Sequence, residues 1–245
     1  MNKTVLITGA SGGIGEAISV AFWQKGCSVI MHYNKNGKEI SKLCAAMNES
    51  RPFSAVTVCC DITKRESVTK LFEEAKSHFG DIDILVNNAG VAEQKLFTDI
   101  TEADWNRIFD INVKGMFFCC QEAVKSMISR KKGKIINISS MWGQVGASCE
   151  VHYSASKGAV IAFTKALAKE LGPSKIQVNC VAPGLIDTPM NKHLDKDALD
   201  AVIEETPLGV IGTPQDVAKS VLFLGSEDSD FITGQVISPN GVLVI

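Results

Sequence analysis

Short runs of consecutive apolar, often β-branched residues recur along the whole chain, and longer segments with helical spacing of apolar positions separate them. Strands buried on both faces of a parallel sheet have this continuous apolar character, whereas half-exposed strands alternate between apolar and polar positions. The pattern therefore predicts strands over residues 3–8, 28–33, 55–60, 82–87, 134–139, 176–182 and 234–238.

Amphipathic helices are expected between these strands. Apolar residues from Ile14 to Phe22 recur with helical spacing, and Gly26 is placed to end that helix. Residues 63–66 have the pattern of a capping box, which predicts a second helix start. Thr213, followed by a proline, predicts another, because proline is favourable at the first helical position.

The alternation of strands and helices indicates an α/β fold of the Rossmann type: a doubly wound, about seven-stranded parallel sheet with helices on both faces, in one domain over residues 1–245. Residues 187–206 interrupt the alternation, since they are polar and lie between Pro183-Gly184 and Pro207. Ligands of such sheets bind beyond the carboxyl ends of the strands, so we expect this segment to cover the substrate. A surface helix without a special role is the alternative.

Composition excludes several classes of protein. The chain has 25 basic and 27 acidic residues, a balance that argues against nucleic acid as a partner. No apolar run approaches the roughly 18 residues needed to span a bilayer, and no signal peptide pattern is present, so we expect a cytoplasmic protein without a membrane partner. The eight cysteines form no Cys-x-x-Cys pattern and have no histidine at ligand spacing, which indicates buried, reduced thiols and no metal site.

A glycine-rich segment follows the first predicted strand and opens the first predicted helix. Its glycines, Gly9, Gly13 and Gly15, have the spacing G-x-x-x-G-x-G rather than the commoner G-x-G-x-x-G. Glycine lets the backbone approach a diphosphate closely, and the free N–H groups of the helix start hold its charge. In this position the segment predicts a dinucleotide site.

A second group of residues indicates acid–base chemistry. Tyr153 and Lys157 lie four residues apart, on one face of a predicted helix. A tyrosine has a pKa near 10, and a nearby lysine cation would lower it toward a value useful for proton transfer. The strand predicted over 134–139 ends in two serines, Ser139 and Ser140, and a hydroxyl there could hold a substrate oxygen.

With these motifs in this order, the chain resembles the short-chain dehydrogenase/reductase family. The glycine spacing, Asp61 after the third strand, the Asn-Asn-Ala-Gly run at 87–90 and the Pro-Gly turn at 183–184 all match family motifs. The match runs from Thr4 to Gly241. It implies an NAD(P)-dependent oxidoreductase that acts on CH–OH or C=O groups, in which the cofactor carries the hydride.

The resemblance also assigns roles to individual residues. It implies that Tyr153 gives a proton to the substrate oxygen, that Ser140 rather than Ser139 holds this oxygen, and that Lys157 also binds the nicotinamide ribose. Asn112 is expected to position a water that connects Lys157 to solvent. The implied cofactor-binding residues are Gly9, Ser11, Gly13, Ile14, Gly15, Asn34, Lys35, Asp61, Ile62, Asn88, Ala89, Gly90, Tyr153, Lys157, Pro183, Gly184, Ile186 and Thr188.

The end of the second predicted strand bears on the choice of cofactor. Family members that prefer NAD(H) carry an acid there, which binds the ribose 2′-hydroxyl and repels a 2′-phosphate. Residues 32–36 contain no acid, and Asn34 and Lys35 could serve a phosphate, so the sequence favours NADP(H) over NAD(H). Lys35 as a merely solvated residue is the alternative, and Gly12 stands where many NADP-binding relatives have a basic residue.

Within the family, the chain most resembles the bacterial 3-oxoacyl-[acyl-carrier-protein] reductases of fatty-acid synthesis. This implies a carrier-bound or small ketone substrate, NADPH and a homotetramer. Residues 130–132 are basic and could attract an acidic carrier protein, although such a cluster is more often a solvated loop. Asn240-Gly241-Val242 departs from the expected Asn-Gly-Gly, which puts the terminal packing and the tetramer interface in doubt.

Two alternatives stay open. Trp142 and Glu150 lie in the substrate-facing loop, and Glu150 stands where oxoacyl reductases often have glutamine. A carboxylate there favours a cationic substrate, and the loop resembles that of reductases acting on the 5-aminopentanone modification of elongation factor P. An acid that simply faces water is the simpler explanation of Glu150. A non-catalytic NADP(H)-binding sensor or scaffold is less favoured, because such members typically lose the tyrosine or the lysine.

Overall fold

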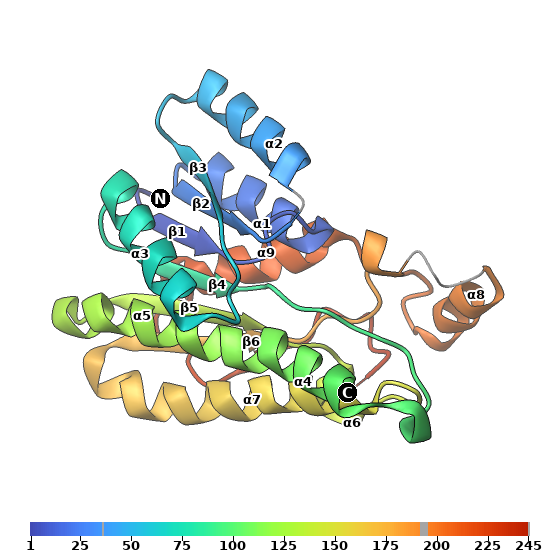
Figure 1. Ribbon diagram of the computed structural model, residues 1–245. Helices are drawn as coiled ribbons and strands as arrows, with labels where there is room; N and C mark the ends of the chain where they lie inside the picture. Colours follow the sequence, from blue (N-terminus) through green and yellow to red (C-terminus); the bar gives the residue numbers. More distant parts are fainter. Residues whose placement is uncertain (36, 192–195, 245) are drawn as a thin grey trace.

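Seven parallel strands form one sheet in the described part of the chain, which comprises residues 1–35, 37–191 and 196–244 of a computed structural model (Figure 1). Their order is β3-β2-β1-β4-β5-β6-β7, so the sheet grows outward in two directions from the neighbours β1 and β4. The strands are β1 Thr4–Ile7, β2 Ser28–Tyr33, β3 Ala55–Cys59, β4 Ile84–Asn87, β5 Gly133–Ile138, β6 Ile176–Val181 and β7 Val236–Ile237. The predicted doubly wound fold is confirmed.

Helices cover both faces of this sheet, as Figure 1 shows. Residues of α1, α2 and α9 pack on one face, and residues of α3, α5 and α7 pack on the other. The α-helices are α1 Gly13–Gln24, α2 Gly37–Ser50, α3 Arg65–Phe79, α4 Glu102–Phe109, α5 Met116–Arg130, α6 Trp142–Val145, α7 Val151–Leu171, α8 Lys196–Glu205 and α9 Pro214–Gly225. A π-helical turn, η2 Asp110–Gly115, joins α4 to α5.

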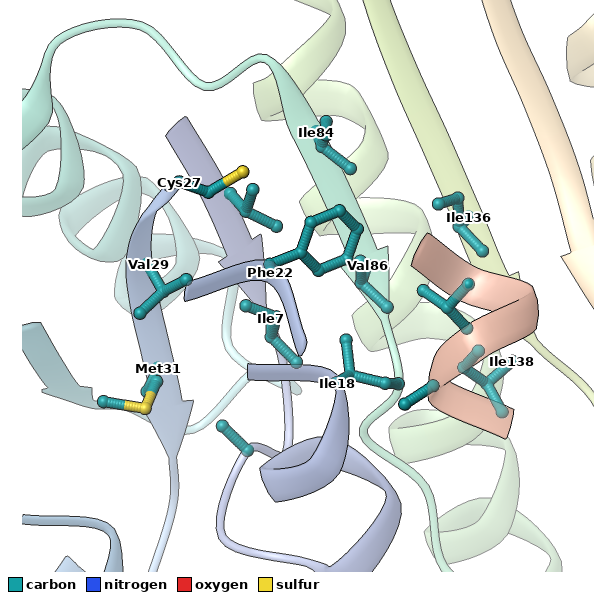
Figure 2. Packing of buried hydrophobic residues seen from close by; sticks show 14 of the residues in the cluster. Ile7, Ile18, Phe22, Cys27, Val29, Met31, Ile84, Val86, Ile136 and Ile138 are labelled. Atoms are coloured by element: carbon teal, nitrogen blue, oxygen red, sulfur yellow. The ribbon is translucent and has the colours of Figure 1, made fainter. Parts of the chain in front are cut away.

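Consecutive strand residues enter opposite cores, which explains why the strands are apolar without alternation. Val5 and Ile7 pack beneath α1 and α9, whereas Leu6, between them, packs beneath α3 and α5. Figure 2 shows the first of these cores, with the ring of Phe22 from α1 against the strands. Helix α9 can pack closely against Phe22 of α1 because residue 225 is glycine; a Cβ there would lie 2.6 Å from Phe22 Cζ.

The helix ends test the predicted caps. Thr213 caps α9 in a capping box with Asp216, as predicted, and Gly26 follows α1 with φ +87°. The capping box predicted at residues 63–66 is wrong, because α3 starts at Arg65 and its N-cap, Lys64, makes no side-chain bond. The Thr63 hydroxyl donates instead to Asp61 Oδ1 at 2.8 Å.

The segment predicted to cover the substrate contains a 3₁₀ turn, η4 Pro189–Asn191, and helix α8. Residues 192–195 of this segment lie outside the described part of the chain. No described residue of α8 is buried, and the helix projects from the body of the molecule in Figure 1. Leu199 of α8, with Ile186 and Thr188, helps to line a cavity of about 160 Å³. A covering role for the segment stays a prediction.

The C-terminal segment crosses from β7 to the turn that follows β6. The Gly184 N–H donates to the Pro239 carbonyl at 3.1 Å, and the Leu208 N–H donates to the Gly241 carbonyl at 3.3 Å. Val242, where the resemblance led us to expect glycine, has φ +71°. A β-branched residue is strained in this left-handed region, so the sequence departure carries a backbone cost.

The helices and the cysteines bear on where such a chain can function. Within its described part, no helix has the length and apolar character that a membrane crossing requires. The eight cysteines carry free thiols, and Cys27, Cys119, Cys120 and Cys180 are buried.

Candidate active site

Most of the predicted site residues follow the carboxyl ends of six strands. Because the strands are parallel, these ends meet at one edge of the sheet, and β1 and β4 bring the central residues together there. The placements are Gly9–Gly15 after β1, Asn34 and Lys35 after β2, Asp61 and Ile62 after β3, Asn88–Gly90 after β4, Ser140 after β5, and Pro183, Gly184, Ile186 and Thr188 after β6.

The glycine loop is tightly packed, both against its own backbone and against Asn88 and Ala89 after β4. Gly9 has φ +65°, and a Cβ on it would lie 2.7 Å from the Cα of Ala89. A Cβ on Gly15 would lie 2.4 Å from the Gly9 carbonyl oxygen and 2.7 Å from Asn88 Nδ2. Helix α1 starts at Gly13 with no side-chain cap, so its first N–H groups remain available for an anion. These features fit the diphosphate of a dinucleotide.

Thr8 and Asn88 join this loop to the end of β4. The Thr8 hydroxyl oxygen accepts hydrogen bonds from the N–H groups of Asn88 at 3.0 Å and Ala89 at 3.1 Å. Asn88 Nδ2 donates to the Thr8 carbonyl at 3.1 Å and to the Gly9 carbonyl at 3.0 Å. Thr8 was not among the predicted site residues, although its place at the end of an apolar strand, directly before the first glycine, was a usable signal.

The ends of β2 and β3 form the side predicted to bind the adenosine part of the cofactor. Asn34 and Lys35 are exposed there, and the Cys59 thiol donates to the Asn34 carbonyl at 3.2 Å. Burial raises the pKa of Asp61, but the hydrogen bonds from Thr63 outweigh it, so this pKa lies below its usual value and the carboxyl is ionised at neutral pH.

The two serines at the end of β5 have different surroundings. The Ser139 hydroxyl donates to the Lys157 carbonyl at 2.8 Å, so its proton is used inside the protein. Ser140 Oγ accepts from the Trp142 N–H at 3.2 Å, and its hydrogen bond to Tyr153 acts to lower the pKa of that tyrosine. Ser140 therefore lies beside Tyr153, and its role in holding the substrate oxygen stays a prediction.

Lys157 and Tyr153 project from the first two turns of α7. Lys157 is buried, and its Nζ donates to the Ile138 carbonyl at 2.9 Å and lies 5.7 Å from the centroid of the Tyr153 ring. Burial lowers the pKa of Lys157 to about 8. Burial also raises the pKa of Tyr153 to about 12, against the hydrogen bond from Ser140, and the charge of Glu150 adds to the rise.

The prediction that Lys157 lowers the pKa of Tyr153 is wrong for the chain without a bound cofactor, because this pKa is raised. The ammonium group points to the carbonyl of Ile138 rather than to the phenol oxygen, and burial dominates the tyrosine. Tyr153 is therefore a protonated phenol at neutral pH.

Asn112 lies in the π-helical turn η2 and is buried. Its Oδ1 accepts from the Val91 N–H at 2.8 Å, and its Nδ2 donates to the Val91 carbonyl at 2.9 Å and to Ser156 Oγ at 3.0 Å. Gly90 separates it from Lys157, since a Cβ at Gly90 would lie 3.2 Å from Lys157 Nζ and 3.3 Å from Asn112 Oδ1. The four residues predicted to be catalytic thus lie around one point.

The loop after β4 is fastened to the loop that carries Glu150. Gln94 Nε2 donates to Glu150 Oε1 at 3.4 Å, and the Lys95 N–H donates to the Cys149 carbonyl at 2.7 Å. Glu150 lies close enough to Tyr153 for its charge to raise the tyrosine pKa. The predicted substrate residue Glu150 therefore faces the same site, and Trp142 starts the short helix α6 beside Ser140.

The buried ammonium of Lys157 predicts a gain in stability when it is removed. The lysine pKa is 10.5 in the unfolded chain and about 8 in the folded one, so protonation favours unfolding. The penalty of about 3 kcal/mol is full below pH 8, shrinks between pH 8 and 10.5, and is absent above. After a loss of about 1 kcal/mol for the bond to Ile138, Lys157→Met should stabilise the protein by roughly 2 kcal/mol at pH 7.

Urea unfolding of the protein without added cofactor, at pH 7 and pH 9.5, measures this difference. The advantage of the variant should be smaller at pH 9.5. A variant that is less stable than wild type at pH 7, or an advantage that does not depend on pH, would show that the ammonium is not penalised by burial.

The chain is similar to known proteins over nearly its whole length. The family model described as short chain dehydrogenase matches residues 3–199. The 3-oxoacyl-[acyl-carrier-protein] reductase FabG of Thermotoga maritima is 40% identical over 99% of this chain and 98% of its own length. The uncharacterized oxidoreductase YmfI of Bacillus subtilis is 39% identical over 98% of each chain. A short-chain dehydrogenase/reductase from Brucella melitensis, described as a glucose/ribitol dehydrogenase, superposes with a TM-score of 0.93 at 33% identity, covering 100% of this chain and 97% of its own.

Proposed function

The chain belongs to the short-chain dehydrogenase/reductase family, and from this membership we propose that it is an NADPH-dependent 3-oxoacyl-[acyl-carrier-protein] reductase. Family membership makes it an oxidoreductase that uses a nicotinamide cofactor on carbonyl or hydroxyl groups. The observation that carries the finer proposal is the 40% identity, over nearly the full length, to a relative with that name. A homotetramer is part of the same proposal.

NADP(H) is proposed over NAD(H) on the charges at the end of β2. Of the residues described there, Tyr33, Asn34 and Lys35, none is acidic, and exposed Lys35 can meet a 2′-phosphate without competition from a carboxylate. Gly9, Gly13 and Gly15 would hold the diphosphate, and Asp61 would contact the adenine. When bound, the reduced nicotinamide supplies the hydride.

Tyr153 is proposed to give its proton to the substrate oxygen. The phenol is protonated at neutral pH, as a donor in the reductive direction must be, and its raised pKa makes it a weaker acid than a free tyrosine. Ser140 would donate a second hydrogen bond to the same oxygen while charge develops on it. Both side chains come from rigid elements, the end of β5 and the start of α7, so the oxygen is held in one geometry.

Lys157 and Asn112 are proposed to return the proton to Tyr153. The buried ammonium, with a pKa near 8, can exchange a proton close to neutral pH. Asn112 Oδ1 uses one lone pair on the Val91 N–H and keeps a second for a water, which would lead from Lys157 to solvent.

The basic cluster at residues 130–132 is not assigned to a carrier protein. Arg130 Nη1 donates to Asp83 Oδ1 at 2.7 Å, and its Nη2 donates to the Ile82 carbonyl at 2.6 Å. The cluster precedes β5, at the amino ends of the strands, whereas the candidate active site lies at the carboxyl ends. The partners of Arg130 are therefore within the chain, and the cluster lies on the opposite edge of the sheet from the candidate active site.

An amine-bearing ketone, such as the 5-aminopentanone group on elongation factor P, is the second candidate substrate. Its support is the Glu150 carboxylate beside Tyr153, which would attract a cation and repel an acidic carrier. A non-catalytic sensor is less well supported, because Tyr153, Lys157, Ser140 and Asn112 are all present and clustered.

NADPH oxidation with acetoacetyl-coenzyme A tests the proposal, with NADH and an amine-bearing ketone in parallel. We expect turnover of the thioester with NADPH, and Glu150→Gln should leave its kcat/KM unchanged or raise it. No turnover of the thioester, with NADPH still bound, would reject the acyl substrate. Turnover of the amine instead, with KM raised about tenfold or more by Glu150→Gln, would establish the second candidate.

A further inference from the structure

His32 is a polar side chain that directly follows three buried apolar residues of β2, Val29–Met31. It is the fifth residue of β2 and pairs in register with Val58 of β3. Only 2% of its surface is exposed. A buried polar group of this kind costs free energy unless all its hydrogen-bonding atoms are used.

Both ring nitrogens of His32 have backbone partners. Nδ1 accepts from the Gly9 N–H at 3.2 Å, and Nε2 lies 3.0 Å from the Cys60 carbonyl oxygen. A backbone N–H can only donate and a carbonyl oxygen can only accept, so the ring is neutral with its proton on Nε2. Burial lowers the pKa of His32, although the bond to the Cys60 carbonyl and the charge of Asp61 both act to raise it. The lowered pKa favours the same neutral form.

These two bonds connect separate parts of the candidate cofactor site. Gly9 opens the glycine loop, and the Asn88 side chain holds the carbonyl of the same residue at 3.0 Å. Cys60 directly precedes Asp61. The main chain of His32 contributes as well, since its carbonyl accepts from the Ala10 N–H at 2.8 Å.

We infer that His32 is a positioning residue, whose neutral ring fixes the glycine loop relative to the end of β3 and so sets the geometry for the diphosphate and the adenosine together. The inference rests on the proposed nicotinamide cofactor. Without the acceptor at Nδ1, the part-buried Gly9 N–H would lose its partner, and the loop would have to move to satisfy it.

Two conservative variants separate the two bonds. In His32→Asn the amide oxygen takes the place of Nδ1 and keeps the bond to Gly9. In His32→Gln the amide nitrogen takes the place of Nε2 and keeps the bond to Cys60. His32→Leu removes both bonds, and His78→Asn, at an exposed position on α3, is the matched control.

The measurement is the Kd for NADPH by calorimetry, with circular dichroism to confirm that each variant is folded. We expect Kd to rise about tenfold in His32→Gln, which leaves the Gly9 N–H without its acceptor, and more in His32→Leu, which loses both bonds. His32→Asn loses only the bond to Cys60, farther from the diphosphate, and should raise Kd by about threefold, whereas His78→Asn should leave it unchanged. Equal Kd values for His32→Gln and wild type, or equal losses in His32→Asn and His32→Leu, would overturn the inference.

A second readout does not need the cofactor. The imidazole ¹⁵N spectrum should show, for His32 at pH 7, a protonated Nε2 and an unprotonated Nδ1. The His32 signal is assigned by its absence in His32→Asn. Protonation at Nδ1 would overturn the inference. A wild-type protein that binds neither NADPH nor NADH would overturn the proposed function and this inference together, whereas unchanged binding in His32→Gln rejects the inference alone.

Discussion

Replacing Tyr153 with phenylalanine is expected to lower kcat by about 10³-fold while the Kd for NADPH stays within a factor of three. The variant removes only the phenol oxygen, which is the proton donor in the proposed reaction, and a positioned general acid contributes about 10² to 10⁴ in rate. The ring itself is part of the packing at the start of α7 and remains. Steady-state NADPH oxidation and calorimetry measure the two quantities.

The outcome separates chemistry from binding. A variant that retains more than a tenth of the wild-type kcat would remove Tyr153 from the role of proton donor. A variant that loses NADPH binding in proportion to activity would mean that the hydroxyl acts on the cofactor. Thermal unfolding of the variant is the control, because a drop in melting temperature would point to lost packing.

Gly15→Ala is expected to raise the Kd for NADPH at least a hundredfold and to destabilise the chain by about 2 to 3 kcal/mol. The new methyl group would lie 2.4 Å from the Gly9 carbonyl oxygen and 2.8 Å from the Ala10 Cα. Both are backbone atoms, so relief requires movement of the glycine loop itself. The loop would then no longer present its N–H groups to the diphosphate.

Gly12→Ala provides the matched control for this prediction. Gly12 has φ −92°, and a Cβ there would have only the Gly9 carbonyl oxygen nearby, at 3.6 Å. We expect unchanged stability and a Kd for NADPH within about threefold of wild type. If both alanine variants bind equally well, close packing of the loop is not what shapes the cofactor site; if both fail equally, the steric argument for Gly15 is wrong.

The sequence predicted the strands well because burial on both faces leaves a strong, continuous apolar signal. Its errors lie at the ends of elements. The strand predicted over 234–238 is reduced to Val236–Ile237, because Gly234 has φ +72° and turns the chain just before the strand. The capping box at 63–66 failed because the Asp61 carboxylate takes the Thr63 hydroxyl, a competition that spacing alone does not reveal.

The sequence predicted which residues gather at the candidate site, but not the pKa of Tyr153 or the partner of the Lys157 ammonium. Spacing along α7 suggested that Lys157 acts on the Tyr153 hydroxyl, whereas the direction of the lysine side chain toward Ile138 depends on how β5 meets α7. His32 was visible as a polar residue after the apolar run Val29–Met31, but its partners Gly9 and Cys60 are 23 and 28 residues away. Contacts of this kind arise from the sheet order, which the sequence does not spell out.

The π-helical turn around Asn112 constrains the length of the chain there. Each residue of an α-helix advances the chain by about 100° around the axis. Removing one residue from Asp110–Gly115 could restore a regular helix, but it would rotate α4 against α5 by about that angle. Either Asn112 would turn away from Val91, or the buried face of α4 around Ile108 would turn toward solvent. In evolutionary terms, this stretch should accept changes of residue more readily than insertions or deletions.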